Sequence, residues 1–234
     1  MKKLIIPMLG SLLLLAACNN STEEKKESSL KEPKLKTESV TYSPADNKDS
    51  LVMDGYIAWD ENIEGKRPAV LVVHEWWGMN DYVKRRVREL AGLGYIAMAV
   101  DFYGNGKRAD NPTDAGKLAT PFYQDPQMAK QRFDAALATL RGYSQTDTTK
   151  IAAIGYCFGG TQVLNMANLG ENLAGVVSFH GGLQVVTPDK AKLKANVLVC
   201  HGGADPFVPA EQVAQFRKQM DSIGAKYTFK VYDG

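Results

Sequence analysis

One short segment constrains the fold of this 234-residue chain more than any other. The apolar run at 151–154 is typical of a buried strand; it breaks at Gly155, and a helical pattern resumes after Gly159. Cys157 therefore lies at the tip of a tight turn from strand to helix, where the strained backbone requires flanking residues without a Cβ atom. The backbone N–H of Phe158 and the helix N-terminus would then face an oxyanion formed beside the thiol. A structural cysteine next to a glycine-rich turn is the alternative interpretation.

The rest of the chain alternates between apolar runs typical of strands and amphipathic segments typical of helices. An antiparallel pair is expected at 40–42 and 51–59, followed by strands at 69–73, 95–100, 151–154, 176–179, 197–200 and 227–232. Helices are expected at about 80–92, 133–140, 158–169 and 209–220. This alternation predicts an α/β fold, a mostly parallel sheet with helices on both faces.

The first eighteen residues have the pattern of an export signal. Lys2 and Lys3 precede an apolar core at 4–15, which is shorter than the about 20 residues of a transmembrane helix. Residues 15–18, Leu-Ala-Ala-Cys, resemble the lipobox of a bacterial lipoprotein, which implies a signal peptide at 1–17 and lipid on Cys18. We expect an exported protein that this lipid anchors to the cell-envelope membrane, the outer membrane where the cell has one. A plain secretory signal is the alternative.

Residues 18–38 have the composition of a tether. They are rich in Glu and Lys and nearly free of large apolar side chains, so they cannot bury enough surface to offset the entropy of ordering. We expect a disordered, lipidated spacer there and one domain at 39–234. The chain has 28 Lys and Arg, two of them in the signal, against 26 Asp and Glu, and this balance gives no indication of a nucleic-acid partner.

The remaining cysteines, Cys157 and Cys200, both lie at the ends of expected buried strands. We expect them to be free thiols, because a disulfide scaffold is typical of much smaller secreted domains. No His, Cys or carboxylate cluster has the spacing of metal ligands, and we expect neither a metal nor a cofactor.

Further candidate site residues follow the expected strands, at the sheet edge where ligands of such folds bind. Asp205 comes after the nucleophile in the chain, as a triad acid does in this kind of sheet; an ordinary turn aspartate is the alternative. Glu75 stands beside two tryptophans, which is costly for a carboxylate without a partner, and the thiol is a plausible partner. A solvated loop glutamate is the alternative there.

Aromatic residues accompany these candidates. The backbone N–H of Trp76 is a candidate second oxyanion donor beside that of Phe158. Trp77, Tyr103 and Phe207 are expected to line the substrate pocket, with simple packing as the alternative.

Four motifs together resemble the dienelactone hydrolase family of the α/β-hydrolase superfamily. They are His-Glu-Trp-Trp-Gly at 74–78, Gly-Tyr-Cys-Phe-Gly-Gly at 155–160, Ser-Phe-His-Gly-Gly at 178–182 and His-Gly-Gly-Ala-Asp-Pro-Phe-Val at 201–208. The likeness covers roughly residues 40–234. It implies a hydrolase of small esters or lactones that forms an acyl-thioester intermediate. It also implies a Cys–His–Asp triad, with Cys157 and Asp205 as its first and last members and Glu75 holding and activating the resting thiol.

The triad histidine is the main departure from this resemblance. The family places it after the last core strand, here 227–232, so we expect it beyond Gly234 and expect this sequence to be C-terminally truncated. His74, His180 and His201 are interpreted as structural.

The substrate and the class of protein stay open to alternatives. Family members that act on dicarboxylate-type lactones grip the carboxylate with arginines, and only the loop cations Lys107 and Arg108 lie near the expected site. We therefore expect the substrate to be any small ester, lactone or thioester. We also expect the protein to be a monomer. A peptidase or acyltransferase on the same fold is one alternative, and a non-catalytic lipoprotein with a degenerate pocket is another. The thiol at the turn tip favours the enzyme, because a dead site does not need it.

Overall fold

A computed structural model describes residues 32–45 and 50–233, which belong to one compact unit. The expected signal peptide, Cys18 and most of the expected tether lie outside the described residues. Within them, no helix is long and apolar enough to cross a membrane.

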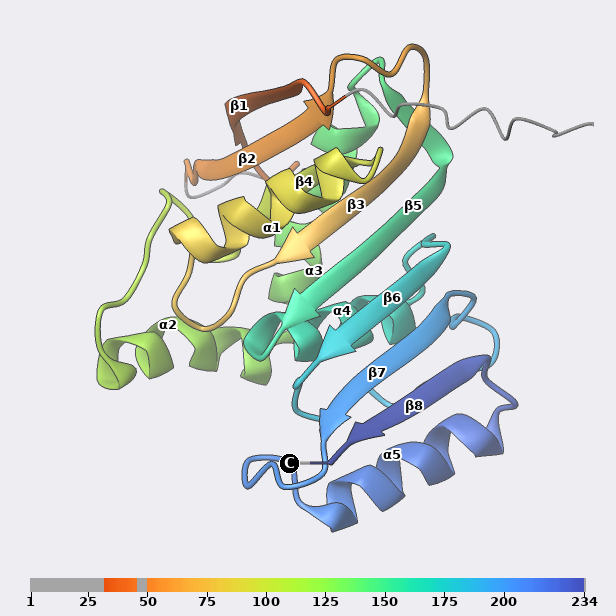
Figure 1. The fold of residues 1–234 in the computed structure, drawn as a ribbon. Helices are drawn as coiled ribbons and strands as arrows, with labels where there is room; N and C mark the ends of the chain where they lie inside the picture. The colour runs from red at the N-terminus through yellow and green to blue at the C-terminus, as the bar shows by residue number, and fades with distance from the viewer. Residues whose placement is uncertain (1–31, 46–49, 234) are drawn as a thin grey trace, which may run out of the picture. The chain divides into compact units, whose positions relative to one another are not determined.

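An eight-stranded sheet forms the centre of the fold, in the order β1-β2-β4-β3-β5-β6-β7-β8 (Figure 1). The strands are β1 (Leu35–Tyr42), β2 (Met53–Asp60), β3 (Arg67–Val73), β4 (Ile96–Val100), β5 (Thr146–Tyr156), β6 (Gly175–Phe179), β7 (Asn196–Gly202) and β8 (Tyr227–Tyr232). β1 pairs antiparallel with β2, and β2 with β4, whereas every later pairing is parallel. The predicted antiparallel start and mostly parallel sheet are confirmed.

In the described part of the chain, five helices pack on the two faces of this sheet. They are α1 (Asp81–Gly92), α2 (Pro112–Gln124), α3 (Pro126–Arg141), α4 (Phe158–Leu169) and α5 (Ala210–Ser222). α1 lies in front of the strands in Figure 1, where its Val83, Val87 and Ala91 pack on β2, β3 and β4. On the other face, a larger hydrophobic cluster of buried side chains contains Phe133 of α3, Val163 of α4 and many others. Helices on both faces are therefore confirmed.

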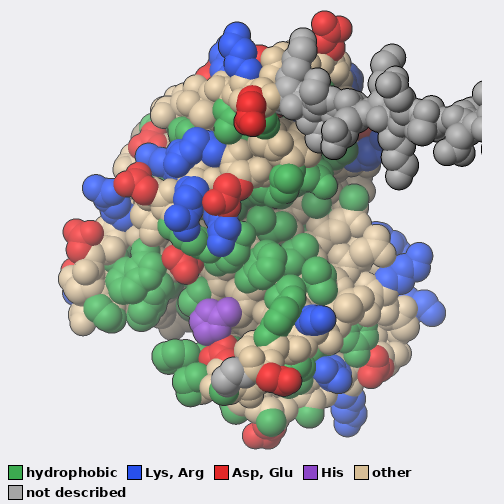
Figure 2. All heavy atoms as spheres, in the orientation of Figure 1, with side chains coloured by type: hydrophobic (Ala, Val, Ile, Leu, Met, Phe, Trp, Pro, Cys, Tyr) green, Lys and Arg blue, Asp and Glu red, His purple; other side chains and the backbone are tan. Residues whose placement is uncertain are grey.

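The face that carries α1 is covered only in part. Alternate side chains of β5, β6 and β7 that point to this face are half-buried: Ile154, Tyr156, Val177, Phe179, Leu198 and Cys200. Figure 2 shows hydrophobic side chains gathered over these strands. The residues between them, such as Ala153, Val176 and Val199, are buried against the opposite helices.

Two expectations need correction. The disordered tether does not extend to residue 38, because β1 begins at Leu35, which pairs with Asp60. The charges of Lys36 and Glu38 that suggested a spacer lie partly exposed on this edge strand, where they form an ion pair at 3.1 Å. The second correction is α2, which the sequence pattern did not predict; it contains Pro121, an unusual residue for a helix interior.

Candidate active site

The turn between β5 and α4 has the strained geometry that its glycines predict. Cys157 adopts φ 54° and ψ −115°, a conformation that costs energy for any residue with a side chain. A Cβ atom at Gly155 would lie 2.0 Å from the carbonyl oxygen of Gly159, and one at Gly159 would lie 2.4 Å from that of Val73. Only glycine fits at these two positions, so the turn is held against the end of β3.

The thiol of Cys157 is half-buried, and the charges of both predicted carboxylates act on it. Burial is the main cause that raises its pKa above the usual value, and the negative charges of Glu75 and Asp205 raise it further. A hydrogen bond from the backbone N–H of Phe158 to the sulfur lowers this pKa. The structure thus brings together Cys157, Phe158, Glu75 and Asp205, and the last two come from strands on either side of the thiol.

Glu75 and Trp76 lie in the loop after β3, next to the elbow. Burial raises the pKa of the Glu75 carboxyl, and the charge of His180 lowers it. The Tyr103 hydroxyl donates a hydrogen bond to the Trp76 carbonyl oxygen at 3.0 Å, which fixes the loop from the side of β4. This bond holds the Trp76 carbonyl, and the role of the Trp76 N–H as an oxyanion donor stays a prediction.

Asp205 follows β7, and its carboxylate is held by two donors. Its Oδ1 accepts the backbone N–H of Phe207 at 2.9 Å, and its Oδ2 lies 2.5 Å from Nδ1 of His180. The sequence interpretation gave His180 a structural role, and the structure instead places its ring against the predicted acid. Because β6 and β7 are adjacent and parallel, the residues that follow them lie side by side. That strand order is the signal that could have found the pair.

The other two histidines have packing roles. His74 is buried and stacks on Phe158 with ring centroids 5.7 Å apart, and its Nε2 accepts the backbone N–H of Phe102. Burial lowers the pKa of His74, so its neutral form is favoured. His201 is buried and packs against Phe229.

The aromatic residues predicted to line a pocket have three different environments. Tyr103 is buried, Trp77 is half-buried and stands edge-on to Trp76, and Phe207 is 80% exposed. Asp101 fixes the position of Tyr103 by accepting its backbone N–H together with those of two glycines in the same loop.

Tyr123 of α2 is a site residue that the sequence analysis missed. It is 48% exposed, and its ring stands edge-on to Phe158 at 5.4 Å. Because Phe158 follows Cys157 in the chain, the Tyr123 ring borders the turn that carries the thiol. No signal in the sequence pointed to it, because the helix that carries it was not predicted.

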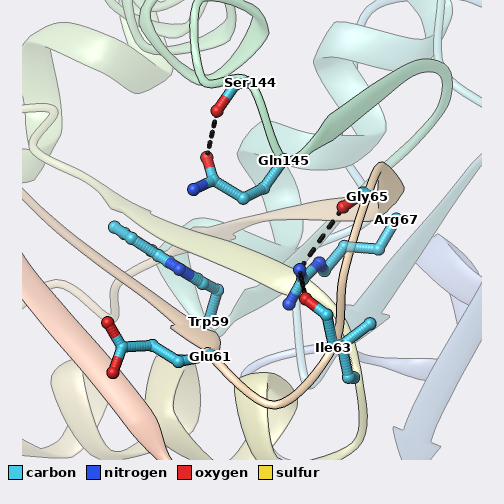
Figure 3. Close-up of a pocket in the computed structure, with 7 residues that line it drawn as sticks. All are labelled: Trp59, Glu61, Ile63, Gly65, Arg67, Ser144 and Gln145. Atoms are coloured by element: carbon cyan, nitrogen blue, oxygen red, sulfur yellow. Dashed lines mark hydrogen bonds between the residues drawn. The ribbon is translucent and has the colours of Figure 1, made fainter.

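A cavity of about 420 Å³ lies at the amino end of β3, opposite the thiol (Figure 3). Figure 3 shows the Arg67 guanidinium reaching to the carbonyl oxygens of Ile63 and Gly65. These contacts brace the loop between β2 and β3, whose residues Ile63 and Gly65 line the cavity. A smaller cavity of about 220 Å³ borders Asp205 and is lined by residues such as Val208, Val213 and Val231. Of the candidate site residues, Asp205 lines this cavity and Cys157 does not.

Metal binding has no support in the described part of the chain: no group of three or more His, Cys, Asp and Glu side chains there is arranged to hold an ion. Cys157 and Cys200 are both free, as expected.

Comparison with known proteins adds a family to this geometry. The model of the dienelactone hydrolase family matches residues 53–234. A protein of Aquifex pyrophilus, Protein usf, is 33% identical over 193 residues, which are 80% of this chain and 81% of the relative. A relative from Aquifex aeolicus (strain VF5), named as a carboxymethylenebutenolidase, is 31% identical with the same coverage. Among solved structures, a dienelactone hydrolase-like promiscuous phosphotriesterase from metagenomic libraries superposes with a TM-score of 0.79 and 31% identity, covering 86% of this chain and 82% of the other.

Proposed function

This chain belongs to the dienelactone hydrolase family and is a hydrolase of ester or lactone bonds, and on that premise we propose that Cys157 is its nucleophile. The observation that carries the proposal is the position of the thiol. It stands at the tip of the strained turn, with a backbone N–H on its sulfur and the charges of two carboxylates acting on it. A cysteine with only a packing role does not require this strain.

The reaction divides into two acyl transfers. The Cys157 sulfur attacks the carbonyl carbon of the substrate, a C–S bond forms, and the carbonyl oxygen becomes an oxyanion that accepts the N–H groups of Phe158 and Trp76. The thiol proton passes to Glu75 as the sulfur attacks; the C–O bond then breaks, and the leaving oxygen takes a proton from the triad imidazolium. Water, deprotonated by the same imidazole, attacks the thioester, the C–S bond breaks and the acid is released, and the thiolate takes its proton back from Glu75.

The imidazole belongs to the triad that Asp205 completes. We place it in the residues that follow β8, as the family order of nucleophile, acid and histidine implies. The end of β8 supports this placement, because the backbone N–H of Gly203 donates to the Tyr232 carbonyl oxygen at 2.8 Å. A loop that leaves β8 there begins beside the loop that carries Asp205.

Glu75 holds the resting thiol in this scheme. Burial raises the pKa of Cys157, so the thiol rests in its neutral form, with the ionised Glu75 as the acceptor of its proton. Such a resting state protects the sulfur from oxidation until a substrate arrives.

The proposed substrate is a small carboxylic ester or lactone. The names of relatives support this class: carboxymethylenebutenolidase for one and 2-oxo-3-(5-oxofuran-2-ylidene)propanoate lactonase for another, which is 26% identical. The backbone of Arg108 forms an isolated antiparallel β-bridge with that of Gly78, next to Trp77. This pairing puts a basic residue next to the Trp77 loop and does not by itself place its charge in the site. We further propose that Cys18 carries lipid and that the enzyme works at the cell-envelope membrane.

The test is kinetic. Cys157→Ala should abolish hydrolysis of a panel of small esters and lactones while leaving the melting temperature near that of the parent, because the side chain lies outside the buried core. Cys157→Ser should retain a trace at most, since the surroundings suit a thiol. Full turnover by Cys157→Ala would refute the proposal.

A further inference from the structure

His74 makes two hydrogen bonds, besides its packing, that the proposed mechanism leaves unused. The residue is buried, with 1% of its surface exposed. Its Nε2 accepts the backbone N–H of Phe102, in the loop after β4, at 3.3 Å. Its Nδ1 lies 2.5 Å from the carbonyl oxygen of Glu75, in the loop after β3. Both ring nitrogens are therefore bound to the backbone of loops that border the site.

These two contacts fix the tautomer of the ring. A nitrogen that accepts an N–H must offer its lone pair, so Nε2 carries no proton. In the neutral imidazole the proton then lies on Nδ1, which donates it to the Glu75 carbonyl oxygen. Burial lowers the pKa of His74, which agrees with a neutral ring. Phe158 stacks on this ring at 5.7 Å and Tyr103 tilts against it at 4.7 Å, so the ring has little freedom to turn.

The carbonyl that His74 binds belongs to the same peptide group as the Trp76 N–H. The Glu75–Trp76 peptide bond is trans, so its C=O and its N–H point in opposite directions. The Glu75 oxygen also accepts the backbone N–H of Gly78 at 3.1 Å, and the two donors together fix the plane of the peptide group. The Trp76 N–H accordingly points away from the buried ring. No hydrogen bond between described residues uses this N–H as its donor, so it is available to a substrate oxygen.

The backbone that carries this peptide group touches the elbow. A Cβ atom at Gly159 would lie 2.4 Å from the carbonyl oxygen of Val73 and 2.7 Å from that of His74. The end of β3 and the start of its loop are thus packed against the first turn of α4, which begins at Phe158. His74 therefore fixes the orientation of a peptide group close to the second proposed oxyanion donor.

We propose that His74 is a positioning residue, which holds the Glu75–Trp76 peptide group so that the Trp76 N–H points to the oxyanion formed when Cys157 attacks. The contact from Nδ1 to the Glu75 oxygen carries this role, and the contact of Nε2 with Phe102 holds the ring. The oxyanion exists only in the transition state and the intermediate, so the effect falls on kcat rather than on KM. This inference rests on the proposed function and adds a residue that acts through another.

Two substitutions at His74 in the full-length protein separate the two contacts. In His74→Asn the amide nitrogen takes the place of Nδ1, so the donor to the Glu75 oxygen is kept while the Phe102 N–H loses its acceptor. In His74→Gln the longer side chain brings its amide oxygen to the place of Nε2, so the Phe102 contact is kept while the donor to Glu75 is lost. Each variant leaves one buried contact unmade, and both should melt lower than the parent by a similar amount.

Hydrolysis should distinguish these matched variants. On a small ester, kcat should fall about 10- to 100-fold in His74→Gln with KM within about twofold, and His74→Asn should stay within about fivefold of the parent in both. The ratio of the rates on this ester and on its thiono analogue, whose sulfur is a weaker acceptor, should fall about tenfold in His74→Gln alone. Equal losses of kcat in the two variants, a larger loss in His74→Asn, or an unchanged ratio in His74→Gln would overturn the positioning role.

A measurement on the parent protein does not depend on how the variants fold. Nitrogen NMR of isotope-labelled histidine at pH 7 should show His74 with a proton on Nδ1 and none on Nε2, the form that both contacts require. The opposite tautomer or an imidazolium would overturn the inference. Hydrolysis that survives Cys157→Ala would instead refute the proposed function, whatever the His74 variants do.

Discussion

Substitution of Gly155 by alanine tests the packing that presents the thiol. The new Cβ atom would lie 2.0 Å and 2.1 Å from the carbonyl oxygen and carbon of Gly159, and 2.7 Å from the nitrogen of Gly160. All three are backbone atoms, so no side chain can rotate away and the turn itself must move by more than about 1 Å to reach ordinary contact. Overpacking of a rigid site costs about 1–3 kcal/mol, and we expect the upper end.

A cost of about 3 kcal/mol lowers the melting temperature of a domain of this size by about 6–12 °C. Activity should fall by about a hundredfold or more even at temperatures where the variant is folded, because a 1 Å displacement of the thiol and the Phe158 N–H ruins their alignment. Calorimetry and ester hydrolysis at 20 °C measure the two effects separately.

Gly116→Ala is the matched control. A Cβ atom at Gly116, in α2, would have no atom within 4 Å, so the exchange should stabilise the helix by about 0.5–1 kcal/mol and leave the rate unchanged. If Gly155→Ala melted and turned over like the parent, the turn would not be packed as described and the argument for the thiol's geometry would fail.

Two further predictions concern Glu75 and Cys18. Burial raises the pKa of Glu75 above its unfolded value, so its ionised form destabilises the fold at neutral pH and this penalty disappears as the pH falls below about 4.5. Glu75→Gln should therefore melt higher than the parent at pH 8 and equally at pH 4, while losing activity; an equal melting temperature at pH 8 would contradict the stated cause. Cys18→Ser should release the protein from membranes or stall its processing, as fractionation and intact mass would show, and an unmodified Cys18 in a soluble mature protein would remove the lipoprotein proposal.

Local chemistry explains which parts of the molecule the sequence predicted. The elbow depends on Gly155 and Gly159, whose missing Cβ atoms are a requirement within a few residues of Cys157. The helix α1 was predicted at about 80–92, and its start depends on a local contact, because the Asn80 side chain accepts the Val83 N–H, as an N-terminal cap does. Contacts between residues that are close together in the chain can be predicted from short segments of the sequence.

The parts that were not predicted depend on tertiary neighbours. The pairing of His180 with Asp205 follows from the adjacency of β6 and β7, which no local pattern encodes. The helix α2 contains Pro121, and its buried side chains Ala115, Ala119 and Phe122 make a weak apolar stripe. Tyr123, which borders the turn that carries the thiol, was missed with it. The early start of β1 was hidden because an edge strand tolerates the charges of a linker.

The central claim is a covalent bond between substrate and Cys157, and the most direct measurement is to trap it. The full-length enzyme, mixed with an activated ester and quenched in acid within milliseconds, should gain the mass of one acyl group. Peptide mapping should place that group on Cys157 as a thioester that hydroxylamine removes. Turnover without any acylated enzyme, or with the acyl group on a residue other than Cys157, would contradict the account.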